Sequence, residues 1–376
     1  MTVLLSTISL LLTSVYIFLL VYFTKGWANL RRPGAYTGTF KTKVTVLIAA
    51  RNEENNISLT IDDLLAQDYP MELTEIIIVD DHSTDSTANI IRSYAGKGVK
   101  LLQLNEDQPL NSYKKKAIAN AIGLSNGELM VATDADCRMD SKWLSSIVGY
   151  YESNNLVMIS APVTYFQERT LFEYLQTLEF AYLIGLGASF IGNRRASTCN
   201  GANLAYRKDI FYEVGGFTGI DDLASGDDEL LLQKVAARYP GRIGFLKHRD
   251  AIVYTHAKHT LGSFLKQRRR WASKSVKYKD KRIVALAVSI WLFNVSLLVN
   301  AGLSFYNIAF LKLFLLQFLL KYVFEITFLL PITTFLKRQG LIVLLILLIP
   351  VHIIYFVYIG LMGSTRKYEW KGRMVK

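Results

Sequence analysis

Residues 129–136 have the sequence Leu-Met-Val-Ala-Thr-Asp-Ala-Asp, an apolar run followed by two carboxylates with one residue between them. A short apolar run of this kind predicts a buried strand over residues 129–133, with Asp134 and Asp136 at its carboxyl end. Open α/β sheets bind their ligands at that end of their strands. Because Mg²⁺ and Mn²⁺ take oxygen ligands and bridge phosphate oxygens, the two carboxylates predict a site for a divalent cation.

Strand-like and helix-like stretches alternate over residues 43–254, which predicts an α/β fold with a mixed, mostly parallel sheet. The predicted strands cover residues 44–49, 75–79, 100–104 and 129–133. The predicted helices cover residues 53–66, a stretch capped by Ser83 and Asp85 that runs towards Tyr94, and residues 113–123. Since the second strand ends at Asp80-Asp81, acidic side chains recur at one edge of the sheet. No glycine-rich phosphate loop follows the first strand, so a bound diphosphate needs another partner for its charge.

The composition of the chain predicts a membrane protein. Hydrophobic residues make up 51% of the sequence, and 43 Lys and Arg against 31 Asp and Glu give a net charge of +12. A basic and apolar chain favours anionic lipid headgroups as its partner, and we expect no nucleic acid because no basic groove or nucleic-acid-binding motif is evident. The two cysteines, Cys137 and Cys199, lack metal-ligand spacing and indicate reduced thiols at a cytosolic face.

The first 24 residues predict a transmembrane anchor. Residues 2–24 carry no charge, are long enough to span a bilayer, and lack the basic start and cleavage site of a secretory signal peptide. Residues 25–42 follow as a basic linker that contains Lys25, Arg31 and Arg32. By the positive-inside rule, this linker is expected to be cytoplasmic and the N-terminus to face outward.

Residues 283–363 predict a C-terminal membrane region of about three helices. The apolar stretches are residues 283–311, 313–336 and 341–363. In the second stretch, Lys321 and Glu325 lie one helical turn apart and can neutralise each other inside a bundle. Three crossings would leave the tail, residues 364–376, outside the cell, although its basic character is typical of the inside. One of the three stretches is therefore expected to be re-entrant or interfacial.

Two further segments are expected at the membrane surface. Residues 259–282 form a basic amphipathic segment that contains Gln267-Arg268-Arg269-Arg270-Trp271, and residues 266–282 hold nine Lys or Arg against one Asp. Residues 171–191 are apolar but contain Glu173 and Glu179, so we expect an amphipathic helix at the interface. His256 and His259 lie shortly before residues 267–271, which are called the box below. Each histidine is expected either at the surface or close to a metal or diphosphate.

In their order and spacing, these motifs resemble family 2 glycosyltransferases of the GT-A fold. The resemblance covers about Lys43 to Trp271 and extends to the membrane-associated branch with a QxxRW motif, which includes ceramide-glucosyltransferase-like, cellulose-synthase-like and hyaluronan-synthase-like enzymes. It rests on residues 44–54, 78–85, 132–136, 215–217, 226–229 and 267–271. It implies a GT-A domain over residues 43–258 and an inverting sugar transfer from a nucleotide-diphosphate donor, with a UDP-sugar expected.

The resemblance also implies roles for individual residues. Those implied to bind the donor nucleotide are Ala49, Arg51, Glu53, Asp80, Asp81, Lys114 and Asp134. The implied metal ligands are Asp136 and, less directly, Asp134, for Mg²⁺ or Mn²⁺. The implied catalytic residues are Asp228 as base, with Asp227, Gln267, Arg270 and Trp271. The implied acceptor residues are Asn200, Gly201 and Trp271.

Three departures or alternatives accompany these roles. Tyr113 stands where the family usually has glycine, and residues 114–116, three lysines, are alternatively a solvated start of a helix. Asp227 and Asp228 are alternatively an acidic first turn that complements a helix dipole. A catalytic base is expected because an inverting transfer needs a carboxylate to take the proton of the acceptor hydroxyl.

The function expected from the sequence is that of an integral membrane glycosyltransferase in the inner or plasma membrane, with its catalytic domain in the cytoplasm. The expected acceptor is a lipid or lipid-linked molecule, because about three apolar stretches make a narrow channel for a polymer. The alternative is a processive polysaccharide synthase. A non-catalytic scaffold predicts loss of the metal and base carboxylates, yet Asp134, Asp136 and Asp228 are all present. The absence of an inverted repeat disfavours a transporter.

Overall fold

A computed structural model describes residues 2–34, 36–105, 110, 112–223, 225–273, 278, 280–362, 368–370 and 373–375. The chain divides into two units. The helical unit comprises residues 1–29, 169–189 and 258–366, and the sheet unit comprises residues 30–168, 190–257 and 367–376. The expected domain over residues 43–258 is therefore interrupted, because residues 169–189 belong with the helices. Lys371, Gly372 and several other residues of the basic tail lie outside the described residues.

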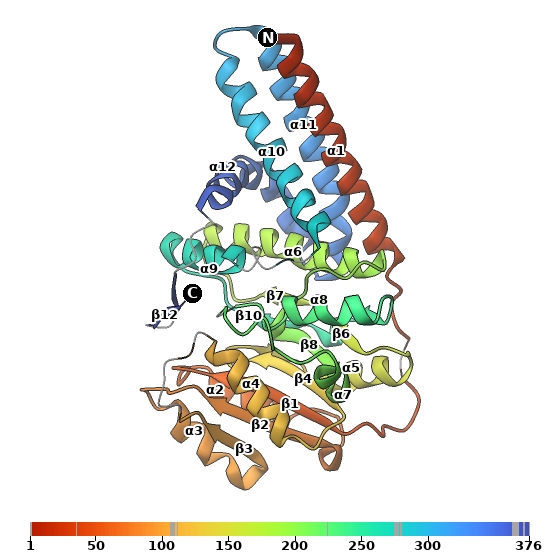
Figure 1. Cartoon of the computed structure of the whole chain (residues 1–376), viewed down its shortest axis with the longest axis vertical. Helices are drawn as coiled ribbons and strands as arrows, with labels where there is room; N and C mark the ends of the chain where they lie inside the picture. Colours follow the sequence, from red (N-terminus) through yellow and green to blue (C-terminus); the bar gives the residue numbers. More distant parts are fainter. Residues whose placement is uncertain are drawn as a thin grey trace. The chain divides into compact units, whose positions relative to one another are not determined.

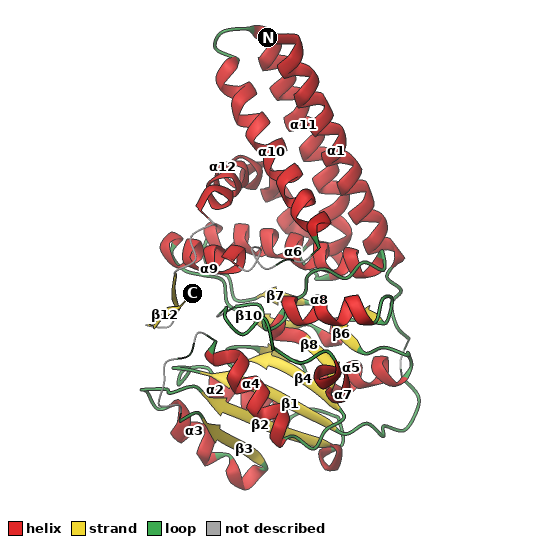
Figure 2. Ribbon diagram, viewed as in Figure 1, coloured by secondary structure: helices red, strands yellow, loops and turns green. Residues whose placement is uncertain are grey.

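The sheet unit is built on a seven-stranded mixed sheet with the strand order β3-β2-β1-β4-β8-β6-β9 (Figure 2). Its parallel part consists of β1 (Val44–Ala50), β2 (Thr74–Asp80), β3 (Val99–Gln103) and β4 (Leu129–Asp134). Strand β8 (Leu204–Arg207) is antiparallel to both β4 and β6 (Met158–Ser160), and β9 (Ile243–Phe245) is parallel to β6. The predicted α/β fold is confirmed, and each of the four predicted strands agrees with the structure to within one residue at either end.

Smaller elements surround this sheet. A three-stranded sheet contains β5 (Arg138–Met139), β10 (Val253–Thr255) and β7 (Val163–Tyr165), and a hairpin contains β11 (Tyr368–Trp370) and β12 (Arg373–Val375). The α-helices of the sheet unit are α2 (Ile57–Leu65), α3 (Thr87–Ser93), α4 (Tyr113–Leu124), α5 (Trp143–Glu152), α7 (Lys208–Glu213) and α8 (Glu229–Arg238). Its short 3₁₀ helices are η1 (Met71–Leu73), η2 (Ala95–Lys97), η3 (Gly201–Asn203) and η4 (Arg249–Ala251).

Helix α2 begins at Ile57, four residues later than the predicted start at residue 53. The backbone N–H groups of residues 52–54 are engaged elsewhere: Glu53 N donates to Thr87 Oγ1 at 2.8 Å, and Glu54 N donates to Asp85 Oδ2 at 3.2 Å. Asp85 also accepts a hydrogen bond from Thr87 N at 3.0 Å at the start of α3. Residues 52–54 therefore form a turn that links the ends of β1 and β2, which the helical periodicity of residues 53–66 does not reveal.

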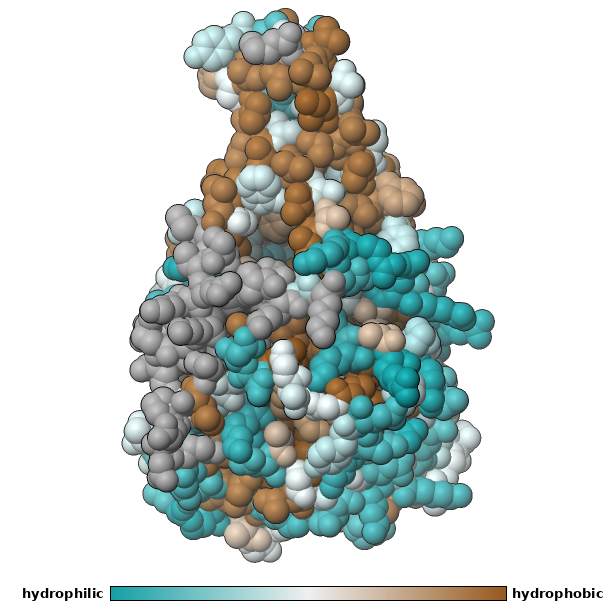
Figure 3. Space-filling view, in the orientation of Figure 1, coloured by the Kyte–Doolittle hydropathy of each residue, from teal (hydrophilic) through white to brown (hydrophobic). Residues whose placement is uncertain are grey.

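The helical unit contains α1 (Thr2–Asn29), most of α6 (Leu171–Gly192), α9 (Leu261–Ser273), α10 (Lys281–Leu303), α11 (Ile308–Phe335), η6 (Gln339–Leu344) and α12 (Leu345–Met362). Among the residues that the structure describes, five segments are long and apolar enough to cross a membrane: α1, α6, α10, α11 and residues 339–361. Helices α1, α10 and α11 run side by side (Figure 1), and their visible surface is largely hydrophobic (Figure 3). The predicted stretch over residues 283–311 is wrong as a single segment, because α10 ends at Leu303 and Asn307 caps α11 by accepting a hydrogen bond from Ala309 N at 2.9 Å.

Buried polar side chains lie between these three helices. Lys321 and Glu325 form the expected ion pair, with 2.7 Å between Lys321 Nζ and Glu325 Oε1, and Tyr16 of α1 donates to the same carboxylate at 2.5 Å. The amide of Gln317 on α11 donates to Thr13 Oγ1 at 2.9 Å and accepts from Asn300 Nδ2 at 2.7 Å. Because these side chains bond to one another across the three helices, they favour this packing of α1, α10 and α11.

Helix α6 differs from the amphipathic interfacial helix predicted for residues 171–191. Most of its length is buried, and the side chains of Glu173 and Glu179 are only 5% and 6% exposed. Glu173 pairs with His259, with 2.7 Å between Oε1 and Nδ1. Helix α12 packs against α10, where Trp291 Nε1 donates to the carbonyl oxygen of Val357 at 3.2 Å, and it also contacts α9. Whether one segment is re-entrant or interfacial stays a prediction.

Candidate active site

Lys114, at the start of α4, joins two acidic motifs that are 93 residues apart in the sequence (134 to 227). Its Nζ lies 2.7 Å from Asp134 Oδ1 at the end of β4 and 3.3 Å from Asp227 Oδ2 just before α8. Burial lowers the pKa of Lys114, but Asp134, Asp227 and Asp228 raise that pKa more, so the lysine is charged. Lys114 is therefore part of the site, and a solvated helix start does not describe it.

Asp228 is held by two backbone N–H groups. Its Oδ1 accepts from Glu229 N at 2.6 Å as the N-cap of α8, and its Oδ2 accepts from Gly201 N at 3.0 Å. A Cβ atom added to Gly201 would lie 3.2 Å from Asp228 Cβ and 3.4 Å from Asp227 Oδ2, so a side chain here would press on both acids. Asn200 caps η3 by accepting from Ala202 N at 2.9 Å. The structure thus brings residues 200–201, predicted to contact the acceptor, next to the predicted base.

Asp134 and Asp136 suit a hard cation. Possible ligand atoms of Asp134, Asp136 and Cys137 lie within 4.8 Å of one another, and both carboxylates are partly exposed. Cys137 is buried, and burial together with the two neighbouring carboxylates raises the pKa of its thiol, so a thiolate ligand is disfavoured. The remaining oxygen donors match Mg²⁺ or Mn²⁺ better than a soft metal.

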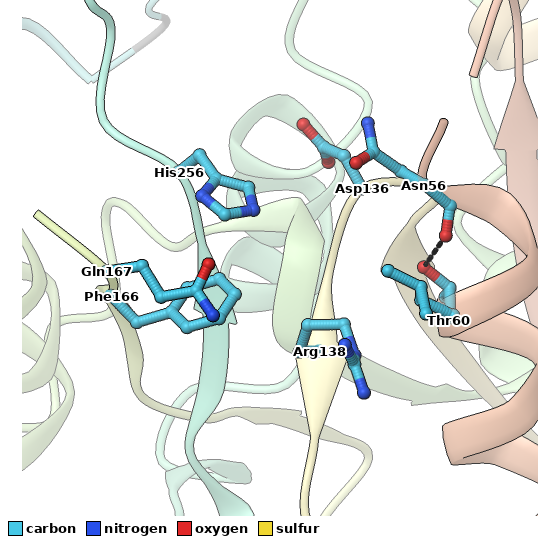
Figure 4. A pocket seen from close by; sticks show the side chains of 8 residues that line it. Asn56, Thr60, Asp136, Arg138, Phe166, Gln167 and His256 are labelled. Atoms are coloured by element: carbon cyan, nitrogen blue, oxygen red, sulfur yellow. Dashed lines mark hydrogen bonds between the residues drawn. The ribbon is translucent and has the colours of Figure 1, made fainter. Parts of the chain in front are cut away.

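A small cavity of about 90 Å³ opens beside Asp136. Figure 4 shows Asp136 next to Asn56 on one side of this cavity and His256 with Gln167 and Phe166 on the other. The rings of His256 and Phe166 lie 4.5 Å apart between centroids. Of the two histidines considered from the sequence, His256 therefore lines the same cavity as Asp136, whereas His259 pairs with Glu173 in the helical unit. The composition of this cavity could not be inferred from sequence, because its residues come from four separate segments.

The residues predicted to bind the donor nucleotide cluster at the ends of β1 and β2. Arg51 Nη1 donates to the carbonyl oxygens of Asp81 and His82 at 2.8 and 2.9 Å, so it braces the loop after β2. The side chain of Asp81 is 2% exposed and its Oδ1 lies 3.1 Å from His82 Nδ1. Tyr113 meets the His82 ring edge-on, at 5.7 Å between centroids. Tyr113, noted in the sequence only as a departure from the family pattern, therefore lines this region.

Three more residues of this predicted group, Ala49, Asp80 and Glu53, lie in the same part of the sheet unit. Ala49 sits on β1 opposite Val79 and Asp134. Asp80 Oδ1 accepts from Ser83 N at 3.3 Å, and Glu53 Oε2 accepts from Asn56 Nδ2 at 2.9 Å.

Gln267, Arg270 and Trp271 lie on α9, which belongs to the helical unit. The neighbouring Arg268 is 3% exposed and forms a buried ion pair with Glu179 of α6, with Nη2 2.5 Å from Oε2. Its guanidinium stacks over the rings of Trp271 and Phe264, at 4.3 and 4.5 Å from their centroids. Gln267 accepts from Arg268 Nη1 at 2.6 Å. Within this unit the box is therefore organised around Arg268, which the sequence did not single out.

Residues 45–215 match the family model described as Glycosyl transferase family 2. The chain is 28% identical over 273 residues to "Probable glycosyltransferase YdaM" of Bacillus subtilis, which covers 64% of this chain and 60% of that protein. Residues 45–215 are therefore similar to family 2 glycosyltransferases.

Two further relatives of this chain have names that give a product. The chain is 32% identical over 109 residues to the "Beta-monoglucosyldiacylglycerol synthase" of Nostoc sp., covering 29% of this chain and 23% of the relative. It is 24% identical over 237 residues to the "Poly-beta-1,6-N-acetyl-D-glucosamine synthase" of Staphylococcus epidermidis, covering 61% and 53% respectively. The chain therefore spans between about a quarter and three fifths of the length of these three relatives.

A solved structure supports the GT-A fold. The mannosyltransferase PcManGT from Pyrobaculum calidifontis, in complex with GDP-Man and Mn²⁺, superposes with a TM-score of 0.62 at 20% identity. The match covers 93% of this chain and 99% of that protein. The GT-A fold implied by the sequence motifs is confirmed.

Proposed function

We propose that this glycosyltransferase moves a sugar, with inversion, from a nucleotide-diphosphate donor to a lipid or lipid-linked acceptor, and that the donor is a UDP-sugar. The observation that carries the proposal is the position of Lys114 between Asp134 and Asp227. This lysine joins the carboxylates suited to a cation and a diphosphate to the acidic pair suited to proton transfer. Donor and acceptor chemistry can therefore take place at one end of the sheet.

At the donor end, we assign Asp136, assisted by Asp134, to a divalent cation. A bound Mg²⁺ or Mn²⁺ would supply positive charge for the diphosphate. PcManGT, which shares the fold, was solved with Mn²⁺ and GDP-Man. Lys114 adds a fixed positive charge beside Asp134, which favours the extra negative charge that develops on the leaving diphosphate. The loop that Arg51 braces is assigned to the nucleotide base and ribose.

At the acceptor end, we assign the base to Asp228. Asp227 is paired with Lys114, with 3.3 Å between Asp227 Oδ2 and Lys114 Nζ. Asp228 Oδ1 accepts from Glu229 N and Oδ2 accepts from Gly201 N, so this carboxylate is held in a fixed orientation for proton transfer. Asp228 then removes the hydroxyl proton while the acceptor oxygen bonds to the anomeric carbon. The bond from that carbon to the diphosphate breaks, and the diphosphate leaves with the electron pair.

The lipid acceptor is supported by five segments with the length and composition of membrane spans and by the relative that is named for glucosyldiacylglycerol synthesis. The alternative, a processive polysaccharide synthase, is supported by similarity to the poly-N-acetylglucosamine synthase. We place the protein in the inner or plasma membrane with the sheet unit in the cytoplasm, where nucleotide sugars occur. The basic linker, residues 25–42, supports this orientation.

The test uses the full chain purified in detergent and returned to liposomes that contain diacylglycerol. Nucleotide release is measured with a panel of UDP-sugars and GDP-sugars, each with and without Mg²⁺ or Mn²⁺, and products are analysed by mass spectrometry. A diacylglycerol that carries one sugar supports the proposal. Polymer formation establishes the alternative, and release from GDP-sugars alone contradicts the UDP assignment.

A further inference from the structure

Lys115 is a buried lysine whose ammonium group binds three backbone carbonyls. Its side chain is among the largest that are fully buried, with 1% of the residue exposed. The Nζ atom donates to the carbonyl oxygens of Ile220, Leu223 and Ser225 at 2.5, 2.7 and 2.8 Å. All three donors of the ammonium group are therefore used, which offsets the cost of burying a charge.

These three carbonyls belong to the segment of residues 220–228, which ends at the acidic pair. Ser225 is two residues before Asp227, and Gly226 between them has a φ of +87°, a conformation that favours glycine. A Cβ at Gly226 would also lie 2.8 Å from the side chain of Leu230. The position of the acidic pair therefore depends on how the preceding backbone is fixed.

Lys114 and Lys115 are adjacent on α4. One contacts a side chain of the acidic pair, and the other contacts the backbone that precedes the pair. Lys114 pairs with the side chain of Asp227, and Lys115 holds the backbone that leads to it. The first turn of α4 thus sets both the charge beside the acidic pair and the path of its main chain. Burial lowers the pKa of Lys115 to about 8, against the opposing effect of Asp227, Asp228, Asp222 and Asp221, so the ammonium form predominates at pH 7.

We propose that Lys115 is a positioning residue for sugar transfer, which fixes residues 220–228 so that Asp228 stays in place beside Gly201. This inference rests on the proposed function, in which Asp228 is the base. Lys115 itself does not touch the reacting atoms. Its loss is expected to displace the base more than the donor site, because the carbonyls that it holds lead to the acidic pair and not to Asp136.

Lys234 provides a matched comparison within the same region. This lysine on α8 also donates to three carbonyl oxygens, those of Gly215, Gly216 and Thr218, at 3.2, 2.6 and 3.1 Å. It holds an earlier part of the chain that does not lead directly into the acidic pair. Lys116 is exposed and serves as a surface control.

The experiment compares Lys115→Met, Lys234→Met and Lys116→Met in the full-length enzyme. Hydrogen exchange without any ligand is read for peptides over residues 215–219 and 220–228. Donor affinity and single-turnover transfer are then measured with a nucleotide sugar that the wild type uses. Lys115→Met is expected to speed exchange in residues 220–228, to keep the donor Kd within about threefold, and to slow transfer on the order of 10–100-fold. Lys234→Met is expected to speed exchange only in residues 215–219, and both Lys234→Met and Lys116→Met should transfer at near wild-type rates.

Several results would overturn the inference. Unchanged exchange in residues 220–228, or unchanged transfer despite faster exchange, removes the positioning role. An equal loss of transfer in Lys234→Met shows that general loosening of the protein is responsible, and not displacement of the backbone that leads to Asp228. If Lys115→Met does not fold, Lys115→Gln is tested, because its amide can still reach a carbonyl; global unfolding of both variants also contradicts the local role. Asp228→Asn is measured in parallel, and full transfer by that variant would show that the base assignment itself has failed.

Discussion

The two members of the acidic pair have different surroundings at the scale of single residues. Asp227 pairs with Lys114 at 3.3 Å, whereas both oxygens of Asp228 accept backbone N–H groups. Because one oxygen of Asp227 is engaged by the ammonium group of Lys114, Asp228 is favoured as the base. The cap on α8 uses only Oδ1 of Asp228, whereas Oδ2 accepts from Gly201 N, and the two contacts together orient the carboxylate.

Asp228→Asn is expected to retain donor binding and to lose transfer on the order of 10²–10⁴-fold, because the amide cannot take the acceptor proton. The amide oxygen can still accept one backbone N–H, so the fold should remain. Asp227→Asn is the matched control and should weaken transfer less. Single-turnover transfer and donor affinity by calorimetry provide the measurement. Equal losses in the two variants, or full transfer by Asp228→Asn, contradict the assignment.

Asp136→Ala is expected to abolish the part of donor binding that depends on Mg²⁺ or Mn²⁺ and to leave the fold intact. The side chain is partly exposed at the end of β4 and does not contribute to the apolar core. Calorimetric titration with the nucleotide diphosphate, with and without Mn²⁺, checks the expectation. Cys137→Ser is the neighbouring control and should keep the response to the cation. Wild-type affinity for donor and Mn²⁺ in Asp136→Ala would show that the cation binds elsewhere.

Sequence patterns could predict the carboxylates of the site but not most of their partners. Asp134, Asp136, Asp227, Asp228 and Lys114 occur in recognisable motifs, so their proximity could be expected. The hydrogen bond from Gly201 to Asp228 and the carbonyl contacts of Lys115 join residues that lie 27 and 105–110 positions apart. Such contacts depend on the register of packed elements, which hydrophobic periodicity does not specify.

At the scale of elements, α9 is joined to α6 and α12 by one buried charge cluster. Glu179 of α6 accepts hydrogen bonds from Arg268 on α9 and, at 2.8 Å, from Tyr355 on α12. Removing one partner of a buried ion pair leaves the other charge uncompensated. Two arginines of residues 267–271 are therefore expected to differ: Arg268 holds the helices together, whereas the family resemblance implies that Arg270 is catalytic.

Arg268→Ala is expected to destabilise the protein by about 3–5 kcal/mol, because Glu179 would remain buried without its partner. Arg270→Ala should keep the melting temperature and lower both donor affinity and turnover. Thermal unfolding in detergent and nucleotide-release kinetics separate the two effects. A stable Arg268→Ala variant would contradict the structural role of Arg268, and unchanged kinetics in Arg270→Ala would reduce its role to contact with the membrane.

Glu75 connects the amino ends of three strands. It accepts hydrogen bonds from Thr45 of β1 at 2.6 Å, from Lys100 of β3 at 2.6 Å, and from the backbone and side chain of Asn126 at 2.8 and 3.0 Å. Burial raises the pKa of Glu75, but these hydrogen bonds lower it by more than burial raises it, so the pKa falls to about 2. Because the folded pKa lies below the unfolded value, the carboxylate stabilises the fold above about pH 4.5, and this stabilisation is lost as the pH falls towards 2.

Glu75→Gln is therefore expected to lower the free energy of unfolding by about 1–3 kcal/mol at pH 7, since it leaves Lys100 and one N–H group without the charge they bind. The difference from wild type should narrow as the pH falls below 4.5. Melting temperatures at pH 7, 4.5 and 3 check both statements, with the exposed Glu72→Gln as the control. A difference that stays constant with pH would mean that packing, and not the charge, is responsible.

At the scale of the whole molecule, composition and apolar runs predicted a sheet-containing middle flanked by membrane helices. The structure contains the sheet unit and helices with the length and composition of membrane spans. The predicted strands of the sheet unit agree closely because their buried apolar runs have clear ends. The helical unit could be predicted less well, because apolar residues are suitable in any part of a membrane segment and do not show where one helix stops. The break at residues 304–307 and the inclusion of residues 169–189 in the helical unit follow instead from polar side chains and from packing.

The last prediction concerns the orientation of the chain in the membrane. The basic linker is expected in the cytoplasm, and the turn between α10 and α11 lies at the same end of the bundle as the N-terminus (Figure 1), so it is expected outside. Tyr36 is a poor labelling position because its hydroxyl bonds to Glu152, whereas Thr37 and Tyr306 are both exposed. In a Cys199→Ser background, which leaves only the buried Cys137, a membrane-impermeant maleimide added to intact cells should label Tyr306→Cys and not Thr37→Cys. After the cells are broken open, both variants should react, which shows that Thr37→Cys is accessible once the reagent reaches it. Labelling of Thr37→Cys in intact cells together with protection of Tyr306→Cys would reverse the orientation and would place the sheet unit away from the nucleotide sugars of the cytoplasm.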